Sequence, residues 1–360
     1  NPQSPIPNPQ LANLYRSKLI KINYFLNVNL YIINLSFKSM IAIILLALFA
    51  SINTSTILLA TEKPFTKEAV EDIKKIIEKS GNTFKLLEKY KTKQELMDSI
   101  KDVDAIIVRS DKITKEVIDS SNNLKVIARA GAGFDNIDLG YASKKGIVVM
   151  NTPGQNANAV AELVFGLLVY AKRNFYDGST GTELKGKKLG LLAFGNVGRN
   201  VARIAKGFGM EIYSYDAFVP KEVLEKEGVH AVENQEFLFT NSDIVSLHIP
   251  ATKETINSIN YELCSKMKKN AILINTSRKE VINEKELIKL MEERKDIKYI
   301  TDIMHDNHEE FLTKFKGRYF ATPKKMGAQT EEANINAGKA AANQIIDFFK
   351  TGKTKFQVNK

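Results

Sequence analysis

Short apolar runs alternate with amphipathic stretches from residue 56 onward. A continuous run of about four to eight apolar residues is typical of a buried parallel strand, whereas apolar residues three or four positions apart indicate a helix. A first series of strands is predicted at 56–60, 83–87, 105–108, 126–128 and 147–150. A second series is predicted at 189–193, 211–215, 244–247, 272–274, 299–302 and 319–321. The pattern predicts an α/β protein with two Rossmann-like, doubly wound parallel sheets.

Amphipathic patterns fill the gaps between the strands. After the first strand, Ala69, Ile73 and Ile77 recur at helical spacing. A long apolar pattern at 158–172 bridges the two series of strands. Further helices are predicted at 197–207, 221–226, 263–268, 283–293 and near 331–349. The strands therefore alternate with helices, as the crossover connections of parallel sheets require.

Residues 1–55 do not follow this pattern. They are rich in Asn, Ile, Leu and Tyr without periodicity, so we expect them to be disordered and outside the fold. Residues 41–50 form an apolar run that is shorter than the ~20 residues a helix needs to cross a bilayer. The run fits a signal-peptide core or an upstream extension fused to a cytoplasmic enzyme. The single cysteine, Cys264, favours the second interpretation and a reducing, cytoplasmic location.

The formal net charge of +11 first suggests nucleic acid or an anionic membrane as a partner. Residues 1–39 contain Arg16, Lys18, Lys21 and Lys38 but no acidic residue, so part of the excess lies outside the predicted fold. The chain shows no helix-turn-helix pattern, zinc-ligand spacing or paired aromatic strand motif. One cysteine also excludes a disulfide scaffold and a thiolate metal cluster. We therefore expect no nucleic acid, membrane or metal partner.

A glycine-rich turn follows the predicted strand at 189–193. Gly195 and Gly198 stand between this strand and a helix, in the context that a dinucleotide-binding turn requires, although Ala193 replaces the first glycine of G-x-G-x-x-G. Gly195 would let a pyrophosphate approach the backbone, and Gly198 would let the helix pack on its strand. Asp216 ends the next strand, where a carboxylate accepts from ribose hydroxyls and repels a 2′-phosphate. NAD is therefore the predicted cofactor; the alternative is a turn that uses its glycines for packing only.

Several further segments resemble the D-2-hydroxyacid dehydrogenase family, and most closely its short phosphoglycerate dehydrogenase branch. They are RS at 109–110, ARAGAGFDNID at 128–138, NTPGQN at 151–156, SLHIP at 246–250 and INTSR at 274–278. Together with the glycine turn they span most of residues 56–360, and such a series in one order is far more specific than the turn alone. The sequence 355–359 is similar to the end of the short branch, so we expect no regulatory domain after it.

The resemblance implies a substrate-binding domain formed by 56–150 plus 325–360, an NAD-binding domain at 151–324 and an active-site cleft between them. The helix at 158–172 would build a homodimer. The implied cofactor contacts are Gly195, Asn196, Val197, Gly198, Asp216, His248, Ile249, Pro250, Thr276, Ser277, Arg278, Asp302, Gly327 and Ala328.

Oxidation of a 2-hydroxy acid needs a cation that holds the carboxylate and the C2 oxygen, and a base that takes the hydroxyl proton. Arg278 follows a predicted buried strand and matches the family's arginine, whose planar fork suits this task. The family's usual base is a histidine backed by a glutamate. Here Lys324 and Lys325 stand where the histidine belongs, and Asn307 stands where the glutamate belongs.

A lysine base is consistent with the loss of the glutamate. A carboxylate beside lysine would raise its pKa from ~10.4, whereas desolvation and a neighbouring arginine would lower it. Counting forward from Pro323 selects Lys324, but counting back from the start of the last helix selects Lys325, which we favour as the acid/base group. His305 and His308 are competing candidates, although their acidic neighbours indicate a solvated turn.

Arg109 and Arg129 each end a predicted strand, so both should reach the edge of the sheet where ligands bind. Two guanidinium groups suit a phosphate, with Ser110 as a helper, unless they pair with acids of the protein instead. Ala132 and Gly133 could offer amides to a carboxylate, and Asn136 is close in sequence.

The resemblance and these residues together predict NAD-dependent oxidation of 3-phosphoglycerate to 3-phosphohydroxypyruvate, the first step of phosphorylated serine synthesis. Within the same family, a glyoxylate or hydroxypyruvate reductase is the alternative. A non-catalytic NADH-sensing protein on the same scaffold is a third possibility, because Ala193 and the missing histidine and glutamate both depart from the pattern.

Overall fold

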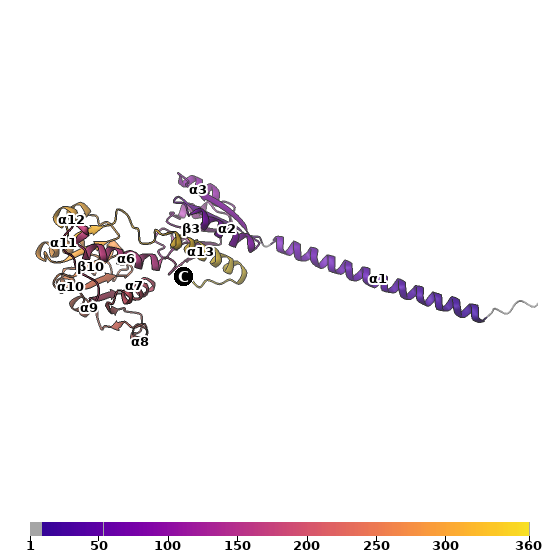
Figure 1. The fold of residues 1–360 in the computed structure, drawn as a ribbon. Helices are drawn as coiled ribbons and strands as arrows, with labels where there is room; N and C mark the ends of the chain where they lie inside the picture. Colours follow the sequence, from indigo (N-terminus) through magenta and orange to yellow (C-terminus); the bar gives the residue numbers. More distant parts are fainter. Residues whose placement is uncertain (1–8, 53, 360) are drawn as a thin grey trace, which may run out of the picture. The chain divides into compact units, whose positions relative to one another are not determined.

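The computed structural model describes residues 9–52 and 54–359. Contacts divide the chain into two compact units, Asn1–Ser55 and Thr56–Lys360. The first unit consists of the helix α1 (Pro9–Ile52), and the second contains all the strands (Figure 1).

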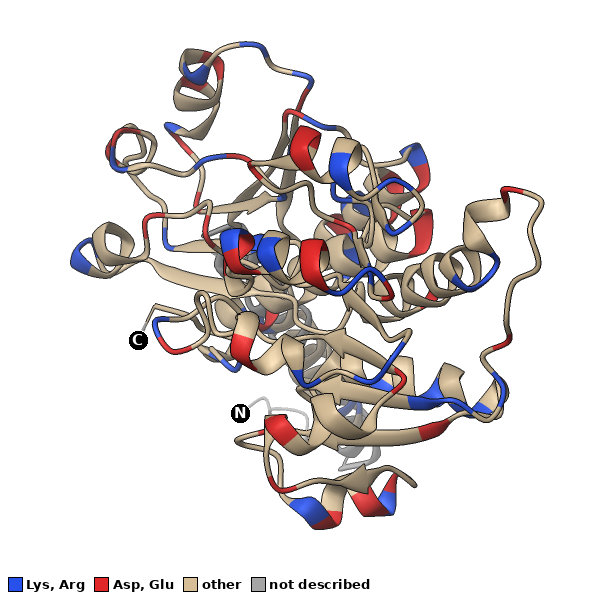
Figure 2. Ribbon diagram, turned by 90° about the vertical axis from the view of Figure 1, so that its left-hand side faces the viewer, with Lys and Arg blue, Asp and Glu red and all other residues tan. Residues whose placement is uncertain are grey.

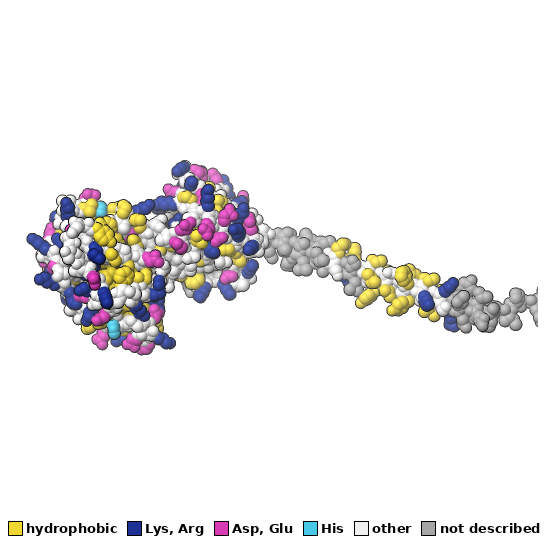
Figure 3. Space-filling model, viewed as in Figure 1, with side chains coloured by type: hydrophobic (Ala, Val, Ile, Leu, Met, Phe, Trp, Pro, Cys, Tyr) yellow, Lys and Arg dark blue, Asp and Glu magenta, His cyan; other side chains and the backbone are white. Residues whose placement is uncertain are grey.

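The helix α1 differs from the prediction that the first 55 residues are disordered, which is wrong for residues 9–52. Neither glycine nor further proline interrupts the sequence between Pro9 and Ile52, so nothing in it breaks a helix. Side chains such as Leu19, Phe25 and Ile33 are exposed along it (Figure 3). The side chains of 42–50, most of the predicted apolar run, lie outside the described residues. Where side chains are described, no helix has an apolar stretch long enough to cross a membrane.

The first sheet is parallel, with the strand order β2-β1-β3-β4-β5. Its strands are β1 (Thr56–Thr61), β2 (Thr83–Glu88), β3 (Ala105–Val108), β4 (Val126–Arg129) and β5 (Val148–Asn151). Its helices are α2 (Lys67–Lys79), α3 (Lys93–Ile100), α4 (Lys115–Asp119) and α5 (Leu139–Lys144). All the strands predicted for this sheet are confirmed, with shifts of no more than one residue at their ends.

The second sheet is also parallel, with the order β12-β11-β10-β9-β6-β7-β8. Its strands are β6 (Lys188–Leu192), β7 (Glu211–Tyr215), β8 (His230–Ala231), β9 (Ile244–Leu247), β10 (Ile272–Asn275), β11 (Lys298–Thr301) and β12 (Tyr319–Ala321). Its helices are α6 (Ala157–Lys172), α7 (Asn196–Gly207), α8 (Lys221–Lys226), α9 (Gln235–Asn241), α10 (Tyr261–Ser265), α11 (Glu284–Glu293) and α12 (His308–Lys314). The predictions missed β8, α9 and α12, which are too short to show a periodic pattern.

The last helix, α13 (Glu331–Thr351), returns the chain to the first sheet. Its buried residues Ala337, Ala341 and Ile345 belong to the same core as Ile57 of β1 and Ile73 of α2. Small side chains let α13 approach α2 closely. Figure 2 shows that most charged residues lie on helices and loops, because the strands of both sheets are covered on their two faces.

Candidate active site

Basic side chains follow the carboxyl ends of strands in both sheets. Arg109 follows β3, Arg129 ends β4 and Arg278 follows β10. Lys325 lies in the loop between β12 and α13. Ligands of parallel α/β sheets bind at this edge of the sheet, so the strand ends place these cations where a substrate would lie.

A polar turn positions Arg278 after β10. The buried side chain of Asn275 donates to the carbonyl of Arg278 at 2.9 Å and accepts from the amide of Ser277 at 3.0 Å. The Arg278 guanidinium donates to the Ser277 carbonyl at 3.0 Å. Its other nitrogen lies 3.8 Å from Asp135, which belongs to the first sheet. The turn therefore brings a cation of the second sheet against a loop of the first.

Lys325 lies beside Arg278, as the backward count from the last helix predicts. Its Nζ donates to the Ser277 carbonyl at 2.9 Å. Surrounding protein and then the Arg278 cation lower the pKa of Lys325 from 10.5 to about 8, although Asp302 opposes them. The residue as a whole remains exposed. A pKa near 8 suits a group that takes up and releases a proton near neutral pH.

Asp302 anchors the loop that carries Lys325. Its fully buried carboxylate accepts from the Met326 amide at 2.7 Å, the Gly327 amide at 2.7 Å and the Thr322 hydroxyl at 2.8 Å. A Cβ on Gly327 would lie 2.9 Å from this carboxylate, so only glycine fits without displacement. The predicted contact between Asp302 and NAD stays a prediction, whereas its contact with the loop is visible.

The two competing histidines lie in the aromatic core of the second sheet. His305 is buried and shares a 2.5 Å hydrogen bond with the Tyr299 hydroxyl, and His308 shares one of 2.9 Å with Tyr319. Burial lowers the pKa of His305 to about 4, so its imidazole is neutral. The prediction of a solvated turn is wrong for His305, because contacts with Tyr299 and Phe311 cover it. Both histidines are therefore weaker candidates for the base than Lys325.

Arg109 and Arg129 form no ion pair with a described acid. Arg109 lies over the ring of Phe65, 5.0 Å from its centre. Arg129 is half-buried, and its Nε has no hydrogen-bond partner among the described groups. Burial and the neighbouring Arg109 and Arg278 lower the pKa of Arg129 to about 10, with Asp135 opposing, so it stays charged at neutral pH. Arg109 and Arg129 are therefore two neighbouring guanidinium groups without an ion-pair partner among the described residues, contrary to the alternative in which they pair with acids.

Two further predicted substrate contacts are Ser110 and Asn136, of which Ser110 is exposed beside Arg109. Asn136 is not free for a ligand, because its amide donates to the Asp111 carbonyl at 2.7 Å. Its role in this structure is to hold the segment that carries Arg109. Asp135 was not singled out by the sequence, although it lies within the motif at 128–138 and contacts Arg278.

The loop 131–133 fits between two of these guanidinium groups. A Cβ on Gly131 would lie 1.3 Å from a nitrogen of Arg129, and one on Gly133 would lie 2.8 Å from a nitrogen of Arg278. Each glycine therefore leaves the room that an arginine occupies. The amides of Ala132 and Gly133 donate to no other group of the described residues, so they are available to an anion.

The glycine turn has the geometry of a pyrophosphate site. A Cβ on Gly198 would lie 2.5 Å from the Ala193 carbonyl, so the close approach of α7 to β6 requires glycine there. A Cβ on Gly195 would meet nothing within 4 Å, which leaves open space for a bound group. No side chain caps the amino end of α7. Free amides at a helix N-terminus bind phosphate, so these residues fit NAD.

Other predicted cofactor residues surround this turn. Asp216 accepts from the Phe194 amide at 2.7 Å and from the amides that follow it; burial raises its pKa, but these hydrogen bonds outweigh burial and lower it. Its carboxylate therefore stays ionised. His248 shares a 2.9 Å hydrogen bond with Ser246. The buried hydroxyl of Thr276 has no partner among the described groups, which leaves a donor for a ligand. Asn196 and Val197 are the first two residues of α7. The remaining predicted contacts lie in loops that follow strands: Ile249, Pro250, Ser277, Gly327 and Ala328.

Ala193 adopts a conformation that favours glycine, with φ of 84°. We expect Ala193→Gly to stabilise the protein by about 1 kcal/mol, because the relief of left-handed strain exceeds the added freedom of the unfolded chain. Thermal unfolding measures the change, which corresponds to an increase in Tm of about 2 °C. The control Ala202→Gly, at a buried position inside α7, should destabilise. An unchanged or lower Tm for Ala193→Gly would show that Ala193 carries no strain.

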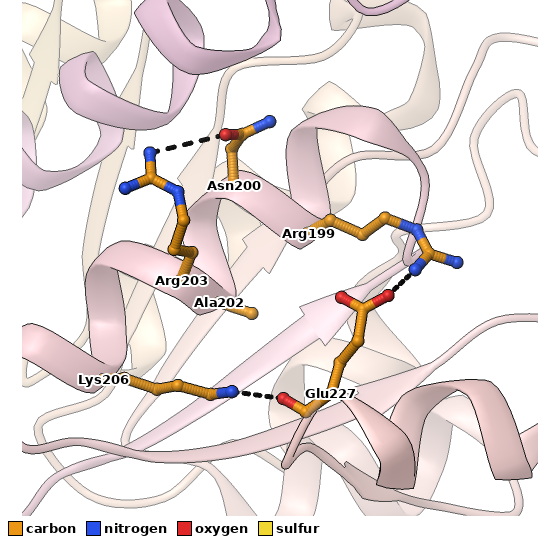
Figure 4. A pocket seen from close by; sticks show the side chains of 6 residues that line it. All are labelled: Arg199, Asn200, Ala202, Arg203, Lys206 and Glu227. Carbon is orange, nitrogen blue, oxygen red and sulfur yellow. Dashed lines mark hydrogen bonds and ion pairs between the residues drawn. The ribbon is translucent and has the colours of Figure 1, made fainter.

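A separate hollow of about 310 Å³ lies along α7 (Figure 4). Its lining side chains contact one another: Arg199 pairs with Glu227, Lys206 donates to the Glu227 carbonyl, and Arg203 donates to Asn200. Arg203 also donates to Asn158 of α6 at 2.6 Å. The cations of this hollow thus have hydrogen-bond or ion-pair partners within the protein, whereas Arg109 and Arg129 have no ion-pair partner among the described residues.

Known proteins resemble the chain in both sequence and fold. It is 40% identical over 271 residues to the D-3-phosphoglycerate dehydrogenase of Methanocaldococcus jannaschii, which covers 71% of this chain and 51% of that protein. The glyoxylate reductase of Thermococcus litoralis is 35% identical, over 74% of this chain and 86% of that protein. The chain thus spans about half the length of the first relative and most of the second.

A solved structure agrees with these relatives. The NAD⁺-bound 3-phosphoglycerate dehydrogenase of Entamoeba histolytica superposes with a TM-score of 0.78 and 48% identity, over 85% of this chain and 99% of that one. Residues 168–322 match the family model of the D-isomer specific 2-hydroxyacid dehydrogenase NAD binding domain. The chain belongs to that family, the D-isomer specific 2-hydroxyacid dehydrogenases.

Proposed function

We propose that the protein catalyses NAD-dependent oxidation of 3-phosphoglycerate at C2, giving 3-phosphohydroxypyruvate for serine synthesis. The observation that carries this proposal is the cluster of Arg109, Arg129 and Arg278, in which Asp135 pairs with Arg278 alone, beside a lysine with a lowered pKa. A substrate with a carboxylate at one end and a phosphate at the other supplies the missing negative charge. The relatives named as D-3-phosphoglycerate dehydrogenases support the same substrate.

Each residue has a defined task in this reaction. Arg278 holds the substrate carboxylate and the C2 oxygen, and the amides of Ala132 and Gly133 bind the carboxylate as well. Arg129 and Arg109 bind the phosphate. Neutral Lys325 takes the proton of the C2 hydroxyl at its Nζ, and protonated Lys325 returns it in the reverse direction. NAD, held at the glycine turn and Asp216, supplies the hydride acceptor.

An absorbance assay of NADH formation from 3-phosphoglycerate tests the proposal directly. We expect turnover with NAD, much weaker activity with NADP because of the Asp216 carboxylate, and inhibition by inorganic phosphate. Turnover of glyoxylate or hydroxypyruvate with NADH, but none of 3-phosphohydroxypyruvate, would overturn the substrate assignment. NADH binding without turnover of any of these acids would instead support the sensing protein.

A glyoxylate or hydroxypyruvate reductase is the second candidate, because relatives with these names are 35% and 44% identical to the chain. Arg129→Ala separates the two. If Arg129 binds phosphate, we expect kcat/KM for 3-phosphoglycerate to fall about 10- to 100-fold, the loss of one charged hydrogen-bonded contact. The rate with hydroxypyruvate, which has no phosphate, should change less than about threefold. Equal decreases in kcat/KM for both substrates would mean that Arg129 does not bind the phosphate.

We also propose a homodimer. The turn after α6 has left-handed backbone at Asn174, Phe175 and Tyr176, with φ of 50°, 57° and 58°. It presents Tyr176 at 67% exposure, beside the half-buried Tyr170 and Phe175. Backbone strain that holds an aromatic side chain in water supports a contact surface at the end of α6.

A further inference from the structure

Two buried residues join the first sheet to the second and also hold the loop 131–133. Asn151 ends β5, and Thr152 follows it, before the chain enters α6. They are 9% and 1% exposed. They belong to the sequence motif 151–156, none of whose residues takes part in the proposed reaction.

Hydrogen bonds from these residues reach the loop at three points. The Gly131 amide donates to the Thr152 hydroxyl at 2.6 Å, and the Thr152 amide donates back to the Gly131 carbonyl at 2.9 Å. The Asn151 side chain donates to the Ala132 carbonyl at 2.7 Å. The amides of Ala132 and Gly133 take no part, so the loop is fixed while these donors stay available.

The loop lies close to both arginines because two of its residues lack a side chain. A Cβ at Gly131 would meet the guanidinium of Arg129, and one at Gly133 would meet that of Arg278. The position of the loop therefore determines how far its free amides lie from the two cations.

The other side of Asn151 is fixed by the end of the chain. The Asn151 amide donates to the Phe356 carbonyl at 3.2 Å, and the Val358 amide donates to the Val149 carbonyl at 2.9 Å. The buried Asn359 side chain accepts from the Val149 amide at 2.8 Å. Asn151 thus ends a strand that is hydrogen-bonded to the end of the chain, and Thr152 follows it directly, which suits an anchor for a loop.

We propose that Thr152 is a positioning residue for substrate recognition: its buried hydroxyl fixes the loop 131–133 so that the amides of Ala132 and Gly133 stay beside Arg129 and Arg278 to bind the substrate carboxylate. This inference rests on the proposed function. Thr152 touches neither substrate nor cofactor in this scheme; it acts through the loop.

Thr152→Val tests the inference, because it keeps the shape of the side chain and removes the hydroxyl that accepts from the Gly131 amide. That amide then keeps only the Arg129 carbonyl, at 2.9 Å, which does not tie it to Thr152. We expect KM for 3-phosphoglycerate to rise at least about 10-fold while kcat changes less than about threefold, since the lost contacts bind substrate and transition state alike. The Kd for NADH should not change. Thr152→Ser, which restores the hydroxyl, should return KM to within about twofold of the native value.

Ser214→Ala is the matched control. Ser214 is also fully buried, and its hydroxyl donates to the Leu191 carbonyl at 3.0 Å within the second sheet. It should lose stability through the same kind of change but keep the native KM. A folded Thr152→Val protein with native KM would overturn the inference, as would an equal rise in KM for Ser214→Ala.

Two further measurements keep the test decisive. If Thr152→Val does not fold, Asn151→Leu removes the donor to Ala132 instead, and a native KM would count against the inference. Hydrogen exchange of residues 129–134 in the full chain without substrate needs no activity. It should rise in Thr152→Val and recover in Thr152→Ser; unchanged exchange overturns the inference, whereas inactivity of the native protein on 3-phosphoglycerate overturns only the proposed function.

Discussion

Lys325→Ala should lower kcat/KM for 3-phosphoglycerate oxidation by about 10²- to 10⁴-fold, the usual contribution of a general base. The Lys325 Nζ lies against the Ser277 carbonyl, in the same turn as Arg278, and its pKa is lowered to about 8. Steady-state kinetics with a fixed, saturating NAD concentration measures the loss. NADH binding should stay native, because the substitution removes a proton acceptor and leaves the glycine turn intact.

Lys324→Ala is the matched control, since the two lysines are neighbours in one loop. Lys324 is exposed and contributes its backbone carbonyl, which accepts from the Thr322 hydroxyl at 2.7 Å, a contact that alanine retains. We expect less than about a threefold change in kcat/KM for Lys324→Ala, because its side chain has no part in proton transfer. Equal, small effects of the two substitutions would refute the assignment of Lys325.

The pH dependence of the native enzyme follows from the same group. If Lys325 is the base, oxidation needs it neutral, so the rate of oxidation should rise with pH and level off above the pKa of about 8. Reduction needs protonated Lys325, so its rate should fall over the same range. A lysine with its ordinary pKa would give a plateau only above about pH 10. Lys325→Ala should abolish this pH-dependent part of the profile, which we call the pH limb, in both oxidation and reduction.

Much of this site could be predicted from the sequence. A short apolar run that ends in arginine places that arginine at the carboxyl edge of a parallel sheet, so Arg109, Arg129 and Arg278 were predictable from β3, β4 and β10. The backward count from the last helix selected Lys325, which lies against the Ser277 carbonyl. The positions of these residues could be predicted because each depended on local pattern and on one general property of parallel sheets, whereas their roles in binding and catalysis stay predictions.

The rest depends on contacts between distant segments, which a local pattern does not contain. The sequence alone does not distinguish a cofactor contact from a loop anchor at Asp302. The structure shows the second, because the amides of Met326 and Gly327 donate to its carboxylate. His305 has acidic neighbours in the sequence, but in space it packs against aromatic rings and its Nδ1 lies 3.4 Å from the distant Glu284. The fit of Gly131 and Gly133 against two arginines is likewise a tertiary property.

Arg278→Ala should reduce kcat/KM about 10³-fold and also change the pH profile of what remains. In the proposed reaction the guanidinium stabilises the charge that develops on the C2 oxygen, and the loss of one such group typically costs 10²- to 10³-fold. It also contributes to the low pKa of Lys325, second only to the surrounding protein. Without this cation, the limb of the pH profile should move to higher pH.

Arg278→Lys separates the two effects of Arg278. Lysine keeps a positive charge near Lys325, so the pH limb should stay close to 8. It has no planar fork to hold the carboxylate and the C2 oxygen together, so kcat/KM should still fall about 10²-fold. Arg203→Ala, in the hollow along α7, is the control for loss of a surface arginine and should keep native kinetics. If Arg278→Lys and Arg278→Ala shift the limb equally, the charge of Arg278 does not tune Lys325, and the surrounding protein alone must account for its lowered pKa.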